Sequence, residues 1–535
     1  MDTHTTIKAA VSPAGWLARG QAGSRRAHQL AVGLLTAAMA AGYSVFSLFR
    51  NYTFHTASYD LVIFDQAVRS YAHFQPGISV VKGIHNGFGP HFSVLGDHWS
   101  PILAVLAPLY WIDGSPQTLL VAQAVLFALA IPPLWLFTRR AFGGGPTATA
   151  AAYLVAAAYA LSWPIASAAN FAFHEVAFAP VLSAVALERL QAGRLRTALI
   201  ALAALLMVKE DMGLLVAGIG LALAVARPAT VPRQRLVALA LIVVGVFDTW
   251  LTSQVLIPAF GGRADYYWAY GALGSNLHQA AWHVLTHPLS ALRLLVTPQV
   301  KLTTMLWLFG AFCFLPLRSP LALAAVPPLL ERMLGSKFPN WWTVPYQYNA
   351  YLVIVLACAA VDGAARLDGS VRRLTERLRG ARDKAAAVIP GSGPVALAGA
   401  VAIFLVALVL VPRFALGHAF RPSFYQRSAS MRAAAAAVAV VPSGVTVEAM
   451  NKLGPQLSGR DTVLIWDARH LEWAPWVVAS VTRHEFTFTS LAQQRGRVAL
   501  LRRSGYRVVF RREGYLVLHR TGARPGAGLP AGGAG

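Results

Sequence analysis

The segment from Tyr59 to Pro101 holds the residues whose types and spacing could do chemistry. It opens with the run Tyr59-Asp60-Leu61-Val62-Ile63-Phe64-Asp65-Gln66, which carries two carboxylates. Further titratable side chains follow: His73, Lys82, His85, His91, Asp97 and His98. Only 13% of the residues in the chain are charged, so this is a dense group. Such side chains can take a proton from a reacting group or bind an anion.

Asp60 and Asp65 are the candidate catalytic carboxylates, and either could be a general base. In a helix, residues five positions apart are separated by about 140°, which disfavours a coupled carboxylate pair. Asp60 precedes an apolar run, so a helix N-cap is a structural alternative that is compatible with a role in a site. Asp65 would lie on an apolar helix face, where burial would raise its pKa.

Three further clusters interrupt apolar segments later in the chain. Phe173-His174-Glu175 and Lys209-Glu210-Asp211 each sit between two such segments, where a solvated turn is the structural alternative. Lysine binds phosphate as a point charge, so Lys209 is a candidate, with Glu210 or Asp211 orienting the phosphate or an acceptor. The third cluster lies in 337–348 and has four aromatic residues: Trp341, Trp342, Tyr346 and Tyr348. These suit an aromatic belt at the membrane surface, and they also suit sugar rings and prenyl chains.

The histidines of the first segment could ligate a metal, but their spacing matches no compact metal motif. The sequence therefore assigns no certain cofactor, and it leaves a divalent cation open. The sequence shows no Walker loop, dinucleotide fingerprint or Gly-x-Ser-x-Gly elbow in a suitable context, which argues against an ATP-driven pump and an α/β-hydrolase.

The composition predicts a membrane protein. Of the 535 residues, 56% are hydrophobic, and the mean hydropathy is +0.52. Apolar runs of about 18 or more residues are typical of membrane spans. We predict about eleven transmembrane helices, some of them short or broken: 29–48, 117–138, 146–168, 172–191, 196–209, 212–227, 236–258, 302–317, 319–334, 346–362 and 393–412. The apolar stretch 101–112 is too short to span.

The formal charge of +24 fits the excess of lysine and arginine in cytoplasmic loops, so we predict no nucleic-acid partner. With the N-terminus inside, alternate loops carry the basic residues Arg139, Arg140, Arg194, Arg196, Arg227, Arg233, Arg235, Arg318 and the stretch 366–384. The acidic and aromatic clusters then lie outside. A basic amphipathic helix on the inner surface and a solvated loop are equal alternatives for 366–390.

Four parts are predicted along the chain. Residues 1–28 form a cytoplasmic tail, and 29–412 form the transmembrane domain with an outer loop at 49–116. Residues 413–520 form a small α/β domain outside the membrane, with candidate strands at 462–466, 507–510 and 515–518 and a hairpin turn at 511–514. The Gly/Ala/Pro-rich tail 521–535 is predicted to be disordered.

The sequence resembles a bacterial family of predicted membrane proteins of unknown function. The resemblance rests on the run 59–66, on His98-x-Ser100-Pro101-Ile102-Leu103 and Ala107-Pro108-Leu109-Tyr110, and on Lys209-Glu210-Asp211. Phe173-His174 and the region of Gln347-Tyr348 fit as well. Trp99 stands where that family usually has Phe, and Glu175 stands where Pro commonly follows Phe-His.

That family is in turn similar to the GT-C glycosyltransferases, which include protein mannosyltransferases and aminoarabinose lipid A transferases. The resemblance implies a GT-C-like transmembrane domain and an inverting glycosyltransferase at the outer face of the cytoplasmic (inner) membrane. It implies a polyprenyl-phosphate-linked sugar as donor and a first-loop aspartate as base, with Asp60 favoured over Asp65. Cations that stabilise the leaving phosphate would then be Lys209, His98 and His174. The predicted substrate-binding residues are Glu210, Asp211, Glu175, Trp342, Gln347 and Tyr348.

Two other classes of function remain open at this point. One is a transporter or flippase for a lipid or polar solute, which needs polar residues along a path through the bilayer. The spans are mostly Ala, Leu and Val, which weighs against it. The other is a non-catalytic membrane assembly protein, which would tolerate asparagine at both Asp60 and Asp65.

Overall fold

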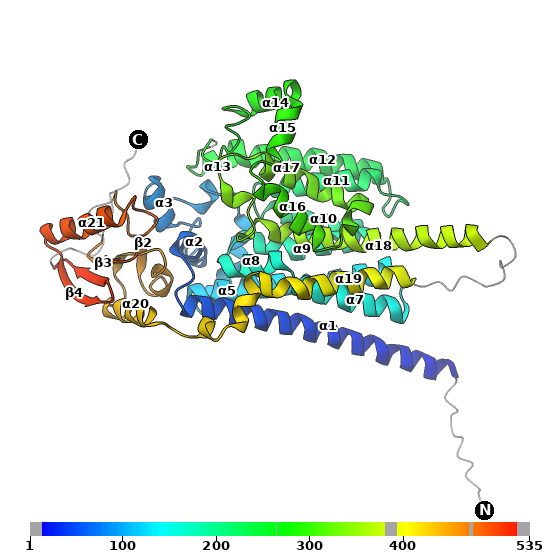
Figure 1. Ribbon diagram of the computed structural model, residues 1–535, viewed down its shortest axis with the longest axis horizontal. Coiled ribbons are helices and arrows are strands. Elements are labelled where there is room, and N and C mark those ends of the chain that lie inside the picture. Colours follow the sequence, from blue (N-terminus) through cyan, green and yellow to red (C-terminus); the bar gives the residue numbers. More distant parts are fainter. Residues whose placement is uncertain (1–12, 264, 380–392, 470–473, 522–535) are drawn as a thin grey trace, which may run out of the picture.

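The molecule is an elongated bundle of helices that carries a small sheet at one end (Figure 1). The computed structural model describes residues 13–263, 265–379, 393–469 and 474–521. The predicted tail 521–535 lies outside the described residues apart from Thr521, as do the first twelve residues of the predicted N-terminal tail. The part 380–392 of the predicted inner segment 366–390 is also outside them.

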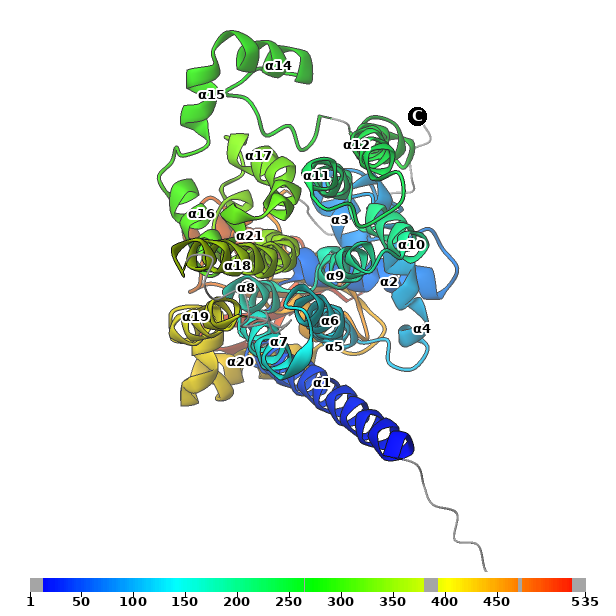
Figure 2. The ribbon, with the colours of Figure 1, turned by 90° about the vertical axis from the view of Figure 1, so that its right-hand side faces the viewer.

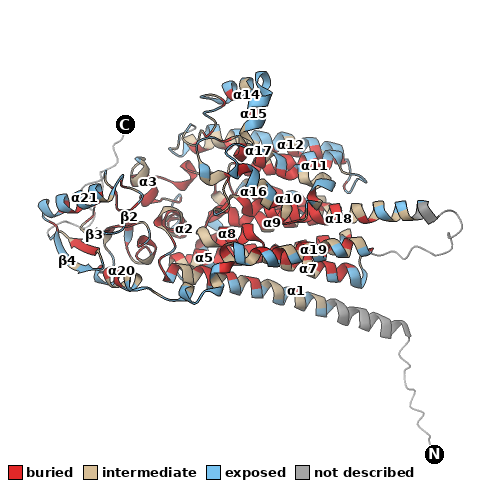
Figure 3. Ribbon diagram, viewed as in Figure 1, coloured by how far each residue is buried: buried red, intermediate tan, exposed pale blue. Residues whose placement is uncertain are grey.

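Thirteen helices of the described chain form the bundle: α1 (Pro13–Tyr52), α5 (Pro116–Ala128), α6 (Ile131–Ala141), α7 (Gly145–Ala160), α8 (Trp163–Phe171), α9 (Phe178–Gln191), α10 (Leu195–Leu206), α11 (Met212–Val225), α12 (Gln234–Leu251), α16 (Val300–Gly310), α17 (Val326–Leu334), α18 (Ala350–Arg379) and α19 (Pro394–Leu410). The apolar stretch of α18 is 78% buried, whereas that of α12 is 22% buried. Figure 3 shows this contrast between the centre and the outer helices. Glycines let α12 approach α11 closely, because a Cβ on Gly213 or Gly245 would meet the backbone carbonyl of the other.

Six stretches of the described chain are helical, long and apolar enough to cross a membrane: Arg26–Tyr52, Pro116–Ala141, Gly145–Phe171, Gln234–Ala259, Gln347–Thr375 and Pro394–Arg413. The membrane class is therefore confirmed, while the count of eleven spans stays a prediction. Five of the predicted spans, 172–191, 196–209, 212–227, 302–317 and 319–334, are shorter helices or broken ones. In particular, 319–334 divides into a 3-10 segment, Pro320–Ala325, and the nine-residue α17. The basic residues up to Arg379 continue α18 rather than forming a separate helix.

The first loop folds over one end of the bundle. It contains α2 (Ile63–Ala72), α3 (Val80–Asn86), a 3-10 segment at Pro101–Leu106 and α4 (Ala107–Tyr110). Ser100 precedes the 3-10 segment and Pro101 occupies its first turn, as the sequence indicates. A second loop follows α12 through α13 (Ile257–Ala259). It carries α14 (Leu277–Thr286) and α15 (Pro288–Leu294), which stand away from the bundle in Figure 2.

The C-terminal part forms a five-stranded sheet with two helices, α20 (Ala429–Val440) and α21 (Leu491–Arg503). Its strands are β1 (Thr446–Ala449), β2 (Thr462–Ile465), β3 (Trp476–Ser480), β4 (Arg507–Arg512) and β5 (Tyr515–His519), in the order β2-β1-β3-β5-β4. β1 runs parallel to β2 and β3, and β5 runs antiparallel to β3 and β4. Glu513 and Gly514 both have positive φ and close the predicted hairpin. In Figure 1 this part lies opposite the start of α1 and the end of α18.

Candidate active site

A cavity of about 1350 Å³ lies between the first loop, the second loop and the ends of the helices next to them. Nine of the predicted site residues line it: Asp60, His98, His174, Glu175, Lys209, Glu210, Asp211, Gln347 and Tyr348. They come from five separate segments of the chain. The fold thus brings together the clusters that the sequence singled out.

Asp60 projects from a break in the chain just before α2. Its backbone has φ 89° and ψ −71°, a region that residues with a side chain rarely adopt. The break separates α1 from α2, whose N-cap is Val62, so Asp60 is not the N-cap that its sequence context suggested. Strained backbone of this kind persists only where the surroundings hold it, and it is frequent at functional sites.

His174 is the neighbour of the Asp60 carboxylate, with 3.4 Å between its Nε2 and Asp60 Oδ1. The histidine lies in the extended segment between α8 and α9, which Gln123 of α5 fixes through two hydrogen bonds. Gln123 Oε1 accepts from the His174 N–H at 3.1 Å, and Gln123 Nε2 donates to the Ala172 carbonyl at 2.9 Å. The imidazole packs between Phe64 and Phe171.

His98 is held by Glu210, which the sequence places far away. Glu210 Oε1 lies 2.7 Å from His98 Nδ1, and Glu210 Oε2 accepts from the Trp99 N–H at 3.2 Å. Burial alone would lower the pKa of His98, but the negative charge of Glu210 outweighs it and raises that pKa above its ordinary value. The imidazolium therefore persists to higher pH than that of a free histidine. The pair places a cation on the cavity wall.

Lys209 is buried beside three carboxylates. Its Nζ lies 3.9 Å from Asp211 Oδ2 and 5.3 Å from the centre of the Tyr348 ring. Burial would lower the pKa of Lys209, but Asp211, Glu210 and Glu175 raise it well above the ordinary value, so the amine stays charged. Within the described chain, Glu175 Oε2 and Asp211 Oδ1 are buried without a hydrogen-bond partner. These oxygens can accept hydrogen bonds from the hydroxyls of a bound substrate.

Lys82 and Asp97 form a second buried ion pair that the sequence did not assign to the site. Lys82 Nζ lies 2.8 Å from Asp97 Oδ1, and the same oxygen accepts a 2.6 Å hydrogen bond from the Tyr267 hydroxyl. The lysine also lies against the rings of Tyr59 and Tyr266. In the sequence, Lys82 stood out only as one of the titratable residues of the segment 59–101. The tyrosines of the second loop come close to it only in the folded protein.

Two predicted site residues lie outside the cavity wall. Asp65 is fully buried behind it, where Tyr110 donates to Oδ1 at 2.8 Å and Arg69 donates to both oxygens at 3.1 Å. Burial raises the pKa of Asp65 to about 6, and these two partners moderate that rise. Trp342 is buried against Lys301, with the Lys301 Nζ 4.5 Å from its ring centre. Both residues therefore support the cavity from behind.

One side of the cavity is apolar and lies on the surface of the bundle. Ile242, Val243, Val246, Phe247 and Trp250 of α12 line it. Phe247 and Trp250 are 55% and 50% exposed, and α12 belongs to a candidate membrane span. The cavity, whose wall also carries charged residues, thus borders an exposed helix that belongs to a candidate membrane span.

The histidines considered as metal ligands are used in other ways. His98 pairs with Glu210, and His85 Nδ1 lies 3.0 Å from Asp467 in the C-terminal part. Among the described residues, no three histidine, cysteine or carboxylate side chains come together as a metal site.

Comparisons with known proteins bear on the family. The family profile described as "Predicted membrane protein (DUF2079)" matches residues 50–517, from the end of α1 to β5. A comparison with curated proteins finds no match. Among solved structures, the chain is similar to the crystal structure of ArnT from Cupriavidus metallidurans bound to undecaprenyl phosphate. The two are 13% identical with a TM-score of 0.45, and the alignment covers 90% of this chain and 97% of that chain.

Proposed function

The chain belongs to the DUF2079 family of predicted membrane proteins, and on this premise we propose that it is an inverting glycosyltransferase that uses a polyprenyl-phosphate-linked sugar. The acceptor hydroxyl enters beside Asp60, and its oxygen attacks the anomeric carbon of the sugar. Asp60 takes the hydroxyl proton as that bond forms. The bond between the anomeric carbon and the phosphate oxygen breaks, and the polyprenyl phosphate leaves with the electron pair.

The leaving phosphate needs cations, and the cavity offers them opposite Asp60. Lys209 is a charged amine in a buried setting, where a phosphate oxygen gains more from it than in water. Glu210 raises the pKa of His98 and so favours its protonated form, which adds a second donor. In this scheme His174 orients the Asp60 carboxylate and lies between the base and the phosphate. Glu175, Asp211, Gln347 and Tyr348 line the space left for the sugar.

The observation that carries the proposal is the shape of this one cavity. Its wall includes the charged residues Asp60, His98 and Lys209 together with apolar residues on the exposed face of α12. A lipid-linked donor has the same two-part form, with a charged head and a long apolar tail. Its tail would remain in the bilayer against Val243, Phe247 and Trp250 while its head reaches the base.

A transporter would need a path to the opposite end of the bundle. The residues of the basic segments 139–140, 194–196, 227–235 and 366–379 are absent from the cavity wall. The cavity thus stays at the end of the molecule that carries the first loop, which favours transfer over transport.

The test is a donor panel with purified protein in lipid nanodiscs. Undecaprenyl phosphate carrying glucose, mannose or arabinose is supplied together with membranes from cells that lack the gene, which provide the acceptor. Glycosyltransfer predicts release of undecaprenyl phosphate from one donor, and loss of that release in Asp60→Asn. If no donor is consumed, while fluorescent undecaprenyl phosphate crosses the bilayer of proteoliposomes faster with the protein than without it, the transferase proposal is wrong.

A further inference from the structure

We propose that Asn451, in the C-terminal part, is a positioning residue that holds the Asp60 carboxylate in place for proton removal. This inference rests on the proposed function, because it gives Asn451 its role through the proposed base. It also gives the C-terminal part a role in the reaction, although none of the described residues of that part lines the cavity.

Three hydrogen bonds connect Asn451 to the residues just before Asp60. Its carbonyl oxygen accepts from the Ser58 N–H at 2.6 Å and from the Ser58 hydroxyl at 2.9 Å. Its side-chain Oδ1 accepts from the Tyr59 N–H at 2.8 Å. One residue of the C-terminal part therefore binds two consecutive residues of the first loop.

These bonds end where the unusual backbone begins. Tyr59 is extended, at φ −65° and ψ 116°, and Asp60 then turns to φ 89°. A residue with a side chain is strained in that region, so contacts with the surroundings must stabilise it. The bond from Asn451 to the Tyr59 amide fixes the peptide that precedes the turn. The turn at Asp60 then directs the side chain of this residue toward His174.

Asn451 is itself held rigidly. It lies two residues after the end of β1, and the intervening Met450 N–H donates to the Val478 carbonyl of β3 at 3.1 Å. The Asn451 N–H donates to Glu485 Oε2 at 2.8 Å, and the Glu485 N–H donates to Gln494 Oε1 of α21 at 2.9 Å. The position of Asn451 is thus fixed by the sheet and by α21. A rigid anchor is what placement of a reacting group requires.

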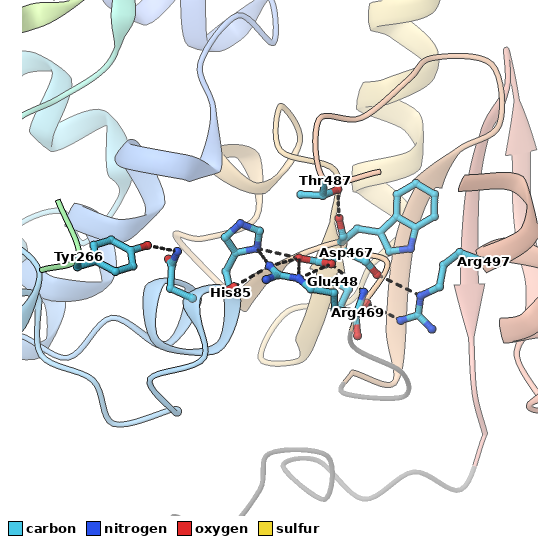
Figure 4. A network of polar contacts seen from close by, with 9 residues as sticks. His85, Tyr266, Glu448, Asp467, Arg469, Thr487 and Arg497 are labelled. Carbon is cyan, nitrogen blue, oxygen red and sulfur yellow. Dashed lines mark hydrogen bonds and ion pairs between the residues drawn. The ribbon is translucent and has the colours of Figure 1, made fainter. Parts of the chain in front are cut away.

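Other contacts dock the same part without a hydrogen bond to Tyr59 or Asp60, although the His85 ring also packs against the Tyr59 ring. Figure 4 shows one of them, where His85 of α3 meets Asp467 and Arg469, and where Glu448 of β1 pairs with Arg497 of α21 nearby. Another is Gln456, whose Nε2 donates to the Asn51 carbonyl at 2.7 Å and to Asn51 Oδ1 at 3.0 Å. Loss of Asn451 therefore leaves several docking contacts in place. Its effect should be local.

Gln456 also provides the matched control. Asn451 and Gln456 are both half-buried amides that dock the C-terminal part, but Asn451 binds the chain next to Asp60 whereas Gln456 binds Asn51 at the end of α1. Four full-length proteins are compared: wild type, Asn451→Ala, Asn451→Asp and Gln456→Ala. Aspartate keeps an acceptor oxygen at the position of Oδ1, so it is the conservative variant.

Two readouts are measured on each protein in nanodiscs. The first is kcat and donor KM for the undecaprenyl-phosphate sugar that the donor panel selects. We expect kcat of Asn451→Ala to fall by about 10- to 100-fold with KM unchanged, because the base moves while the cavity wall stays intact. Asn451→Asp and Gln456→Ala should keep a kcat close to that of wild type. The second is hydrogen exchange of the peptide that contains Tyr59, which should be faster in Asn451→Ala alone.

The outcomes separate this inference from the proposed function. If Asp60→Asn is inactive while Asn451→Ala keeps the wild-type kcat, the positioning role is wrong and the transferase stands. If Asn451→Asp loses as much kcat as Asn451→Ala, or if Gln456→Ala loses as much, the acceptor oxygen has no special role and the inference is also wrong. If Asp60→Asn is fully active, the proposed function fails before Asn451 is considered. Exchange of the Tyr59 peptide needs no substrate, so it reports on the contact if Asn451→Ala lowers thermal stability.

Discussion

Asp60 Oδ1 and His174 Nε2 lie 3.4 Å apart, across a cavity wall built from the first loop and the segment between α8 and α9. The histidine cannot shift freely, because Gln123 binds its backbone and Phe64 and Phe171 flank its ring. The aspartate cannot shift freely either, because its backbone is turned to positive φ. The two side chains therefore hold defined positions in the cavity wall.

Lys209 should dominate binding of the lipid phosphate. We expect Lys209→Met to weaken binding of undecaprenyl phosphate by about 10- to 100-fold, the usual effect of losing one charged hydrogen bond. The measurement is titration of undecaprenyl phosphate into the protein in detergent, followed by native mass spectrometry. Lys452→Met, at an exposed lysine of the C-terminal part, is the control and should bind as wild type does. Equal affinity for Lys209→Met and wild type would remove Lys209 from the phosphate site.

The pH dependence of that binding should follow His98. Because Glu210 raises the pKa of His98, the cation persists to higher pH than that of a free histidine and is lost as the pH rises through the raised pKa. Affinity for undecaprenyl phosphate should therefore fall on the alkaline side. In Glu210→Gln, burial of His98 dominates, so the fall should begin at lower pH. Binding curves of the two proteins at several pH values check this. Superimposable pH profiles would contradict it.

Asp65 should affect the stability of the folded protein rather than the rate of catalysis. Its folded-state pKa of about 6 lies above the ordinary value of 3.8, so the folded protein holds the proton more tightly than the unfolded chain does. The contribution of Asp65 is thus greatest below pH about 4 and is lost as the pH rises through about 6. The loss amounts to about 3 kcal/mol. Asp65→Asn lacks this titration.

Thermal unfolding in detergent tests that role of Asp65. The Tm of wild type minus that of Asp65→Asn should decrease as the pH is raised from about 4 to about 7. Taking the difference cancels the titration of all other groups. A difference that stays flat or increases would contradict the assignment.

The sequence predicted which residues line the cavity better than it predicted how those residues are arranged. Local patterns were sufficient to predict that the clusters at 173–175 and 209–211 belong to the site. Charged residues between two apolar helices are conspicuous, and the helices place both clusters at the same end of the bundle. The strands β2, β4 and β5 and the turn at Glu513-Gly514 were also predicted, since β-branched runs and a glycine turn are local signals.

Other features depend on contacts between distant segments and could not be read from spacing. The ring of tyrosines around Lys82 comes from the second loop, and the Tyr59 amide is bound by Asn451 nearly four hundred residues later. The break at Asp60 was missed because an apolar run after an aspartate looks like a capped helix. β1 and β3 were missed because short buried parallel strands show no alternation of polar and apolar residues.

The side of the membrane on which the cavity lies is predicted from the basic loops. In a background with Cys313 and Cys358 replaced by alanine, Lys452→Cys and Thr375→Cys place one thiol at each end of the molecule, at an exposed and a half-buried position respectively. A membrane-impermeant maleimide applied to intact cells with a permeabilised outer membrane should label Lys452→Cys and spare Thr375→Cys. The reverse pattern would place the cavity on the cytoplasmic side.

The central claim is that Asp60 removes the acceptor proton, and one comparison tests it most directly. Sugar transfer from the undecaprenyl-phosphate donor is measured for wild type, Asp60→Asn and Asp65→Asn in nanodiscs with donor saturating. The account predicts that Asp60→Asn lowers kcat by about 10²- to 10⁴-fold, the contribution typical of a positioned general base. Asp65→Asn should retain most of the activity. Full activity of Asp60→Asn, whether or not Asp65→Asn is impaired, would contradict the account.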